Sequence, residues 1–453
     1  MIAPARRAAL QALSAVDRGA ELPVALARTR DELADERDRA LAAAIVTGTL
    51  RWRSRLDFLI EQHASRPAAS LDDDILQVLR LSVFQLLFLD RVPASAVVDD
   101  AVSLAKAQRK KSAAGFVNAV LRAISRRRER IDWPEPPPVI AADTDREAAI
   151  EALALTQSHP RWLVARWIDR LGIAATRAWL AFNNTEPAIT LRVNRSRATP
   201  EQVAAELTAA GVETQPARWA PNGLVVGAGH PLRTALSATG AFMVQDEASQ
   251  LVPIMLGVRP AMRVLDACAA PGGKALIVSD ALAGRGLLVA GDLRPRRLAV
   301  LRDLLTQHGA SALLVRHDLA RGVPFGSVFD RVLVDAPCTG LGTLRRDVDI
   351  RWRRTEADVL AAGPRQRAML GEAARAVAPG GRLVYATCST EPEENDDVVA
   401  AFLATHPAFR LVRPETLLAE GVPGPLIDDQ GVLRTRPDLH GLEVFFAAAM
   451  QRD

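Results

Sequence analysis

Cysteine is scarce in this chain of 453 residues, which contains only Cys268, Cys338 and Cys388. So few cysteines do not form a disulfide framework, and a reducing compartment, the cytoplasm, is the expected location. No two of them have the C-x-x-C spacing of a zinc site, and the seven histidines form no cluster. The sequence therefore predicts no metal site.

Long apolar runs are also absent. No stretch of about 18 apolar residues occurs, so we expect no membrane span. Asp17 and Arg18 interrupt the apolar residues that follow Arg6 and Arg7, which argues against a signal peptide. The composition, with 49% apolar and 24% charged residues, is typical of a globular protein, and the length indicates two or three domains.

Lysine is rare as well, since it supplies four of the 57 basic residues. The net charge of +4 and the pI of about 9.3 describe a mild basic excess, which permits contact with nucleic acid without requiring it. Basic runs at residues 109–111 and 126–128 end helical stretches. Such a run is compatible both with a solvated helix end and with an RNA contact.

The front of the chain has its apolar residues at helical spacing, for example Leu10, Leu13 and Val16. A Pro-rich segment at residues 131–138 predicts a domain boundary. We expect three domains. They are an all-α domain at residues 1–132, a helical linker with a small α+β domain at 142–244, and an α/β domain at 245–453.

Two arginines of the middle domain, Arg192 and Arg195, lie on or beside a predicted strand at residues 190–194. A helix at 200–210 and another strand at 223–226 follow. The two arginines could face phosphates, although an exposed strand Arg commonly has no ligand.

The last domain alternates strands and helices. Strands are predicted at residues 263–266, 286–291, 312–316, 331–334 and 381–386, and helices near 273–283, 295–308 and 355–378. Such alternation indicates an open parallel sheet that binds ligands at the carboxyl ends of its strands. Residues 443–449 are expected to add an antiparallel edge strand.

The stretch 264–274 organises this domain. Apolar residues lead to Asp266, and small residues with Gly272 and Gly273 then open a helix. This pattern predicts a strand, a tight loop and a helix start whose backbone N–H groups favour a polar or anionic ligand. An ordinary turn between a strand and a helix is the alternative.

The spacing of these glycines fits neither a phosphate-binding P-loop nor the G-x-G-x-x-G dinucleotide fingerprint. It therefore argues against an oxidoreductase with redox thiols, a second class of enzyme that the cysteines would allow. Asp292 ends the next predicted strand, where a carboxylate can accept hydrogen bonds from ribose hydroxyls. We therefore expect a nucleoside cofactor without a pyrophosphate.

Three later strands end in reactive or charged residues. The third ends at Asp318, the fourth at Asp335 and Cys338, and the fifth at Cys388. The carboxyl ends of parallel strands share one crevice, so these side chains should meet there. A cysteine is often only a small buried hydrophobe, but the polar neighbours Thr339, Thr387 and Ser389 favour a site.

Two thiols and a carboxylate beside a nucleoside cofactor fit one reaction on pyrimidines. A thiolate that adds to C6 makes C5 carbanion-like, so that C5 can take a methyl group from a sulfonium. An acid near N3 can stabilise the charge that develops on addition. A second group must then remove the C5 proton and allow the first thiol to leave. The residues meet these needs as Cys388, Cys338 and Asp335.

These motifs resemble those of RNA cytosine-5 methyltransferases, and the match extends over nearly the whole chain. The methyltransferase motifs are VQDEAS (244–249), DACAAPGGK (266–274), DAPCTGLG (335–342) with Arg345 and Arg346, and TCS (387–389) with Glu394 and Asn395. The front, with Asp38-Arg39 and GFVNAVLR (115–122), resembles the NusB fold. The combination is similar to the Sun/Fmu group of the RsmB/NOP family, bacterial 16S ribosomal RNA cytosine-5 methyltransferases.

The resemblance implies a Rossmann-like methyltransferase domain that binds S-adenosylmethionine. It implies Cys388 as the nucleophile and Cys338 as the residue that helps to release the product. Residue chemistry alone leaves these two roles open, because DNA cytosine-5 enzymes use a Pro-Cys nucleophile. Asp292 would face the ribose and Asp318 the adenine. The full set of implied cofactor-binding residues is Cys268, Ala269, Ala270, Pro271, Gly272, Gly273, Lys274, Asp292, Asp318 and Asp335.

The sequence departs from the family after Arg346, where it has Asp347-Val348-Asp349 and the family often has His-Pro-Asp. We therefore do not transfer the family's residue roles to this loop near the target base.

The implied partner is 16S ribosomal RNA, before full subunit assembly, and no obligate protein partner is expected. The target should be a loop base or a flipped base, because a helix hides C5 and C6. A transfer-RNA cytosine-5 methyltransferase and a non-catalytic NusB-like RNA-binding factor are the alternatives.

Overall fold

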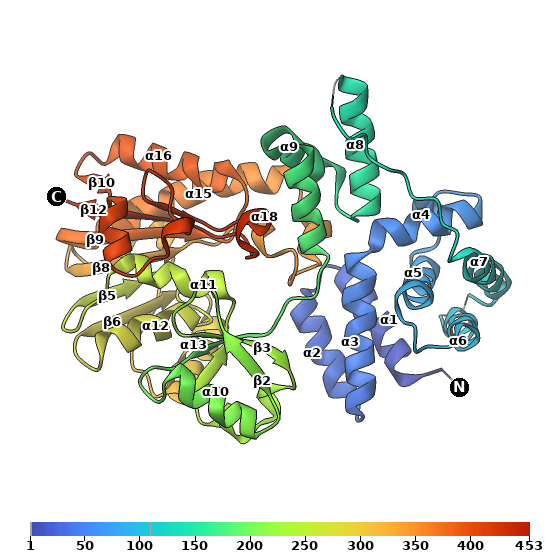
Figure 1. Cartoon of the computed structure of the whole chain (residues 1–453), viewed down its shortest axis with the longest axis horizontal. Helices are drawn as coiled ribbons and strands as arrows, with labels where there is room; N and C mark the ends of the chain where they lie inside the picture. The colour runs from blue at the N-terminus through green and yellow to red at the C-terminus, as the bar shows by residue number, and fades with distance from the viewer. Residues whose placement is uncertain (1, 109, 141) are drawn as a thin grey trace. The chain divides into compact units, whose positions relative to one another are not determined.

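The computed structural model describes residues 2–108, 110–140 and 142–453, so Arg109 of the basic run at 109–111 lies outside the described residues. The chain forms two compact units (Figure 1). Unit 1 contains Met1–Thr185 with Leu344–Thr355, and unit 2 contains Glu186–Thr343 with Glu356–Asp453. The three domains predicted from the sequence stay a prediction. Within the described ranges, no helix is long and apolar enough to cross a membrane.

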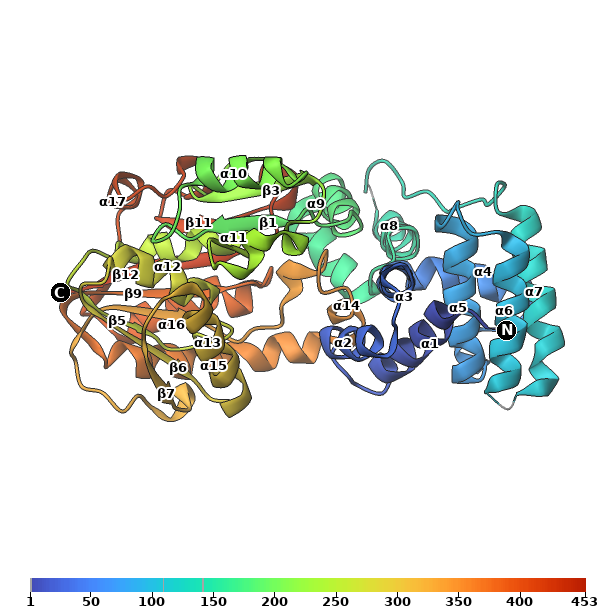
Figure 2. The ribbon, with the colours of Figure 1, turned by 90° about the horizontal axis from the view of Figure 1, so that it is seen from below.

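Unit 1 is helical, as the apolar spacing predicts. Its centre is α5, whose residues from Ile75 to Leu86 are all buried, including the polar side chains of Gln77, Arg80, Ser82 and Gln85. The helices α4, α5, α6 and α7 lie side by side (Figure 2). The helices of this unit are α1 (Pro4–Asp17), α2 (Leu22–Glu32), α3 (Glu36–Arg51), α4 (Arg53–Ala64), α5 (Asp73–Phe88), α6 (Ala94–Ala107), α7 (Ala114–Arg127), α8 (Asp143–Thr156), α9 (Arg161–Asn183) and α14 (Ile350–Arg353).

The segment Leu344–Thr355 joins unit 1 although it lies in the sequence between strands of unit 2. Val348 is part of the unit 1 core, and the Trp352 indole Nε1 donates a hydrogen bond of 2.6 Å to the Leu50 carbonyl. The side chain of Arg351 is fully buried. This segment begins six residues after Cys338, so the polypeptide passes from that cysteine directly into unit 1.

Unit 2 begins with a small antiparallel sheet in the order β2-β3-β1-β4. Helix α10 (Pro200–Ala209) packs on it through Val203 and Leu207 (Figure 2), and Thr199 caps the helix by accepting a hydrogen bond from Gln202 N. The elements predicted at 190–194, 200–210 and 223–226 are present. The strands are β1 (Thr190–Val193), β2 (Glu213–Pro216), β3 (Gly223–Ala228) and β4 (Phe242–Val244).

The large sheet has eight strands, of which seven follow the order β10-β12-β9-β8-β5-β6-β7, while β11 pairs with β12. The strands from β9 to β7 are parallel. The chain places β6 and β7 on one side of β5, and β8 and β9 on the other, so the order reverses between β5 and β8. The strands are β5 (Arg263–Asp266), β6 (Leu287–Asp292), β7 (Leu313–Arg316), β8 (Phe329–Asp335), β9 (Val377–Thr387), β10 (Phe409–Leu411), β11 (Val432–Arg434) and β12 (Phe446–Arg452).

All five predicted parallel strands are present, but one expectation about the sheet is wrong. The strand expected at 443–449 forms as β12 and is antiparallel to β9, yet it is not at the edge. The short strand β10 pairs with its other side and takes the edge position. Phe409–Leu411 has only three residues, too few for alternation to reveal it.

Helices cover both faces of this sheet and bury it in two cores. On one face, α12 (Gly273–Leu282) and α13 (Pro295–His308) contribute Leu276, Val278, Leu301 and Leu305. On the other face, α15 (Glu356–Ala374) and α16 (Asp396–Thr405) pack against β8 and β9 (Figure 1). The short helices α11 (Glu247–Leu251), α17 (Pro414–Ala419) and α18 (Pro437–His440) complete the unit.

Candidate active site

A cavity of about 310 Å³ lies at the carboxyl ends of the parallel strands, where the strand order reverses. Such a reversal leaves a crevice between loops that run in opposite directions, and ligands of open α/β sheets bind there. The loops after β5, β6, β7, β8 and β9 all contribute to its wall. The lining residues are Ala267, Cys268, Ala270, Asp292, Leu293, Arg294, Arg297, His317, Asp318, Leu319, Asp335, Ala336, Pro337, Cys338, Arg365, Met369 and Cys388.

The cavity brings together the residues predicted from different strand ends. Asp292, Asp318, Asp335, Cys338 and Cys388 all line it. Of the loop 268–274, Cys268 and Ala270 line it as well. Ala269, Pro271, Gly272, Gly273 and Lys274 do not line the cavity, and the contacts of Gly272, Gly273 and Lys274 are described below.

The loop glycines are required by packing. Gly272 has a φ of +122°, and a Cβ there would stand 2.7 Å from the Leu301 side chain. A Cβ on Gly273 would stand 3.0 Å from the Gln245 amide. The two glycines therefore let the loop pack close to α13 and to the segment after β4, which aims the start of α12 at the crevice.

Lys274, one of the few lysines in the chain, pairs with a predicted site residue. Its Nζ lies 2.6 Å from Asp335 Oδ2 and 5.3 Å from the Phe445 ring centroid. Burial alone would lower the pKa of Lys274, but the ion pair with Asp335 outweighs it and raises that pKa. Lys274 therefore holds the Asp335 carboxylate at the cavity wall rather than lining the cavity itself.

The two thiols of Cys338 and Cys388 are in contact, with their Sγ atoms 3.3 Å apart. Cys338 follows β8 and Cys388 follows β9, which are parallel neighbours. The contact with Cys338, and after it burial, raise the pKa of Cys388 well above its ordinary value. Both thiols reach the same cavity, as the two predicted roles require.

A buried carboxylate joins the two cysteine loops. Glu394 is fully buried, and its oxygens accept hydrogen bonds from Thr339 N at 2.8 Å and Gln366 Nε2 at 3.1 Å. The hydroxyls of Thr339 and Ser389 also donate to it. Thr339 follows Cys338 and Ser389 follows Cys388, so Glu394 fixes the two loops to each other.

The carboxylates at the ends of β6 and β7 are held by neighbouring groups. Asp292 Oδ1 accepts a hydrogen bond of 3.0 Å from Arg294 N, and Asp318 Oδ1 accepts one of 3.2 Å from Ala320 N. Next to Asp318, the His317 ring lies against Gly291, where a Cβ would be 2.2 Å from Nε2. These contacts fix both acids at the wall of the cavity.

Sequence reasoning missed several residues of the site. Asp266 lies beneath the loop with both carboxylate oxygens buried and without a hydrogen-bond partner. Burial, and after it the charge of Asp335, raise the pKa of Asp266 to about 7. His317, Arg297 and Arg365 line the cavity. His317 could have been predicted because it is next to Asp318 in the sequence. Arg365 could not, because it comes from α15 and no motif surrounds it.

The geometry fits a nucleoside sulfonium. The cavity combines the polar wall of Asp292 and Asp318 with the apolar groups of Leu293, Leu319 and Met369, as a nucleoside requires. Asp292, Asp318 and Asp335 bring three carboxyl groups to the cavity, which can receive a cationic group. Within the described ranges, no group of three or more His, Cys, Asp or Glu side chains could hold a metal ion.

Fold and site together define a Rossmann-like methyltransferase with a helical front. Family models match in the same arrangement. The 16S rRNA methyltransferase RsmB/F model covers residues 253–451, the NusB family model covers 3–126, and the RsmF/B-like ferredoxin-like domain covers 159–233.

Curated relatives cover almost the full length of the chain. It is 32% identical to the probable ribosomal RNA small subunit methyltransferase B of Bacillus subtilis, over 93% of this chain and 92% of that protein. It is 36% identical to ribosomal RNA small subunit methyltransferase B of Pseudomonas putida, over 89% and 90%. The crystal structure of PH0851 superposes with a TM-score of 0.81 at 26% identity, over 100% of this chain and 99% of that one.

The chain belongs to the RsmB family of methyltransferases. Its cofactor is S-adenosylmethionine, and the NusB-like front and the Rossmann-like fold predicted from the sequence are confirmed.

Proposed function

We propose that this protein methylates C5 of a cytosine in 16S ribosomal RNA through a covalent bond between Cys388 and C6. The observation that carries the proposal is the 3.3 Å contact between the Cys338 and Cys388 sulfurs in a cavity that Asp335 also lines. S-adenosylmethionine supplies an electrophilic methyl group when it is bound. Every other requirement of the reaction falls on residues of this chain.

Cys388 begins the reaction. Its sulfur, as the thiolate, forms a bond to C6, and the C5–C6 π electrons become available at C5. The Asp335 carboxylate, held by Lys274, takes up the proton that the Cys388 thiol gives up and passes it to N3, which neutralises the charge that develops there. Because contact with Cys338 and burial disfavour the Cys388 thiolate in the free protein, the thiol must give up its proton when RNA enters.

Cys338 completes the reaction. Once C5 carries the methyl group and the Cys338 thiol has passed its proton to water, the Cys338 thiolate takes the C5 proton and the C5–C6 double bond forms again. The C6–sulfur bond breaks with its electrons returning to Cys388, and N3 returns its proton to Asp335. Two adjacent sulfurs on different loops can serve both steps without a rearrangement of the site. Glu394 holds these loops together through the hydrogen bonds from Thr339 and Gln366.

We propose that the cofactor lies against residues 268–274, with Asp292 at the ribose and Asp318 towards the adenine. The front residues 1–132 and the middle residues 142–244 would contribute RNA contacts, with the methyltransferase domain at 245–453. Support for the substrate comes from the relatives whose names specify the ribosomal small subunit. Ribosomal RNA that has not yet assembled into a subunit, in the cytoplasm, offers an accessible base.

Bisulfite mapping tests this proposal. Cells that lack the protein should lose one C5-methylcytidine from 16S ribosomal RNA. The wild-type protein should restore it, and Cys388→Ala should not. A lost methyl group in transfer RNA instead would select the transfer-RNA alternative. An unchanged methylation map, with RNA binding retained in the purified protein, would select a non-catalytic RNA-binding factor.

A further inference from the structure

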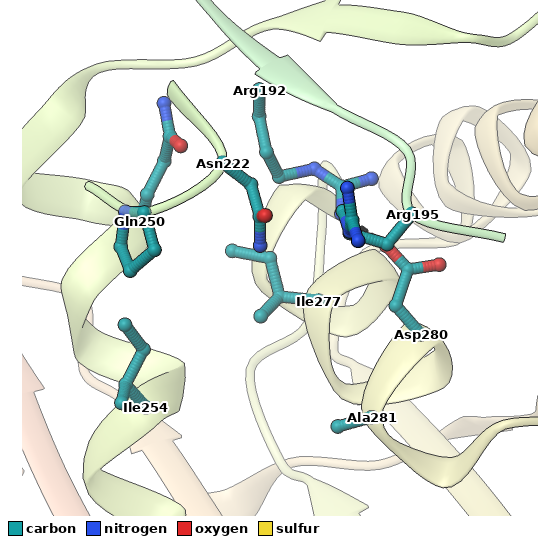
Figure 3. A pocket seen from close by; sticks show the side chains of 9 residues that line it. Arg192, Arg195, Asn222, Gln250, Ile254, Ile277, Asp280 and Ala281 are labelled. Atoms are coloured by element: carbon teal, nitrogen blue, oxygen red, sulfur yellow. Dashed lines mark hydrogen bonds and ion pairs between the residues drawn. The ribbon is translucent and has the colours of Figure 1, made fainter. Parts of the chain in front are cut away.

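A second cavity of unit 2, of about 220 Å³, lies between the small sheet and helix α12 (Figure 3). Arg192 and Arg195 come from β1 and the turn after it, and Ile277 and Asp280 come from α12. Gln250 and Ile254 lie on the other side of the pocket in that view. None of these residues lines the active-site cavity.

Arg192 is not the exposed strand arginine that the sequence suggests. Only 3% of the residue is accessible, and its Nη1 donates a hydrogen bond of 2.6 Å to Asp280 Oδ2. The other two guanidinium nitrogens, Nε and Nη2, are buried without a partner. Buried donors of a charged group that have no partner are unfavourable, so this guanidinium can take a further acceptor.

The charge and the lining of the cavity indicate which kind of group could accept hydrogen bonds from Arg192 and Arg195. Two guanidinium groups and one carboxylate line it, which leaves a single positive charge. A phosphodiester carries a single negative charge and offers oxygens to guanidinium donors. Pro221, Ile254 and Ile277 form an apolar wall, against which a ribose or a base can pack.

We propose that this pocket binds one phosphodiester of the substrate RNA, with Arg195 as the accessible contact and Arg192 as the buried one. The inference rests on the proposed RNA methyltransferase function and adds a backbone contact outside the catalytic cavity. Phosphate contacts fix the register of a strand without reading its sequence. The pocket therefore positions RNA for the active site of the same unit.

Binding of poly(U) RNA to the full-length protein tests the pocket. Arg195→Ala should weaken binding roughly tenfold and reduce the slope of log K against log salt by about 0.7, the value for one phosphate contact on a single strand. Asp280→Asn removes the competing carboxylate and should strengthen binding roughly threefold. Weaker binding by Arg195→Ala together with stronger binding by Asp280→Asn indicates a phosphate contact, because a general loss of folding would weaken binding in both variants.

Arg413→Ala is the matched control. Arg413 is an exposed arginine of the same unit, next to β10 at the far edge of the large sheet, and its removal should leave the affinity and the salt slope nearly unchanged. Photo-crosslinking of thiouridine-containing RNA should map to the peptide that holds Pro221 and Asn222, and Arg195→Glu should abolish that crosslink.

Three results would overturn the proposal. Arg195→Ala could bind poly(U) like the wild type, Asp280→Asn could weaken binding, or inorganic phosphate alone could bind the pocket as tightly as RNA. If wild-type protein methylates RNA while any of these holds, only the pocket assignment fails. If wild-type protein binds and methylates no RNA, the proposed function itself fails.

Discussion

Single residues set the charge balance of the site, and Asp266 is the clearest case. Its carboxyl group is buried without a partner, and burial and Asp335 raise its pKa to about 7. The ordinary value of 3.8 applies to the unfolded chain. Between these two values the folded protein binds a proton that the unfolded chain releases, so stability falls as the pH rises.

We predict that Asp266→Asn removes this pH dependence. In cofactor-free protein, the wild type should lose stability relative to Asp266→Asn by about 1.4 kcal/mol for each pH unit, up to about pH 7, and the difference should then level off. Denaturant titrations at a series of pH values measure it. Asp303→Asn, at an exposed acid of α13, should parallel the wild type. A constant difference across this range would show that Asp266 does not titrate there.

Residue types and strand ends were sufficient to predict Asp292, Asp318, Asp335 and the two cysteines as neighbours. Their chemistry is visible in the sequence because each follows an apolar strand. Asp266 ends a strand too, but the burial of its carboxyl group depends on packing that no local pattern reveals. The partner of Lys274 was likewise invisible, since Asp335 is 61 residues away.

At the scale of elements, the site depends on the close approach of the loops that follow β8 and β9. Gly342 N donates a hydrogen bond of 2.9 Å to the Cys388 carbonyl. A Cβ on Gly342 would lie 2.7 Å from that oxygen and 2.3 Å from the Val444 carbonyl. Both neighbours are backbone, so they cannot move aside cheaply.

We predict that Gly342→Ala separates the two cysteine loops and lowers kcat by at least about tenfold, because misplacing reacting groups by about 1 Å can cost 100-fold. Gly326→Ala is the control, since nothing lies within 4 Å of a Cβ there. Single-turnover methylation at saturating RNA and cofactor measures the effect. An active Gly342→Ala protein would mean that the loops need not touch.

Glu394 also holds the two cysteine loops together, through its hydrogen bonds from Thr339 and Ser389. We predict that Glu394→Gln keeps the fold but lowers kcat more than it changes the RNA or cofactor KM, because a Gln amide cannot accept all the hydrogen bonds that the carboxylate accepts. Glu394→Asp should recover part of kcat. If both variants changed KM alone, Glu394 would act in binding and not in the placement of the cysteines.

The five parallel strands were predictable because each is a short apolar run bounded by turn residues. The strands that the sequence does not reveal are β2, β4, β10 and β11. The first of them is polar and largely exposed, and the other three have three residues each. Their pairing is set by tertiary contacts, which is why β12 was wrongly predicted at the edge.

At the scale of the whole molecule, one segment of the methyltransferase sequence folds with unit 1. The Arg351 guanidinium lies at its centre, with Nη1 donating to the carbonyls of Arg51 and Ser158 and to Asn184 Oδ1, and Nη2 to the carbonyls of Asn183 and Leu344. The residues that supply these oxygens lie up to 300 positions from Arg351 in the sequence. No local pattern could predict that Leu344–Thr355 leaves its own domain.

We predict that Arg351→Met destabilises unit 1 by on the order of 3 kcal/mol, because several buried carbonyls lose their donor. Thermal unfolding with protease mapping should show unit 1 opening first, and the RNA KM should rise before cofactor binding is lost. Arg28→Met, at an exposed position of α2, is the control. Simultaneous loss of both units at one lower temperature would mean that they unfold as a single body.

The most direct test of the account is the capture of the covalent complex between enzyme and RNA. Each cysteine variant is incubated with 16S ribosomal RNA and S-adenosylmethionine and analysed under denaturing conditions. Cys338→Ala should accumulate a methylated RNA–protein adduct, because the C5 proton stays in place, and Cys388→Ala should form none. An adduct with Cys388→Ala and none with Cys338→Ala would exchange the two roles, and methylated RNA produced by Cys388→Ala would contradict the covalent mechanism itself.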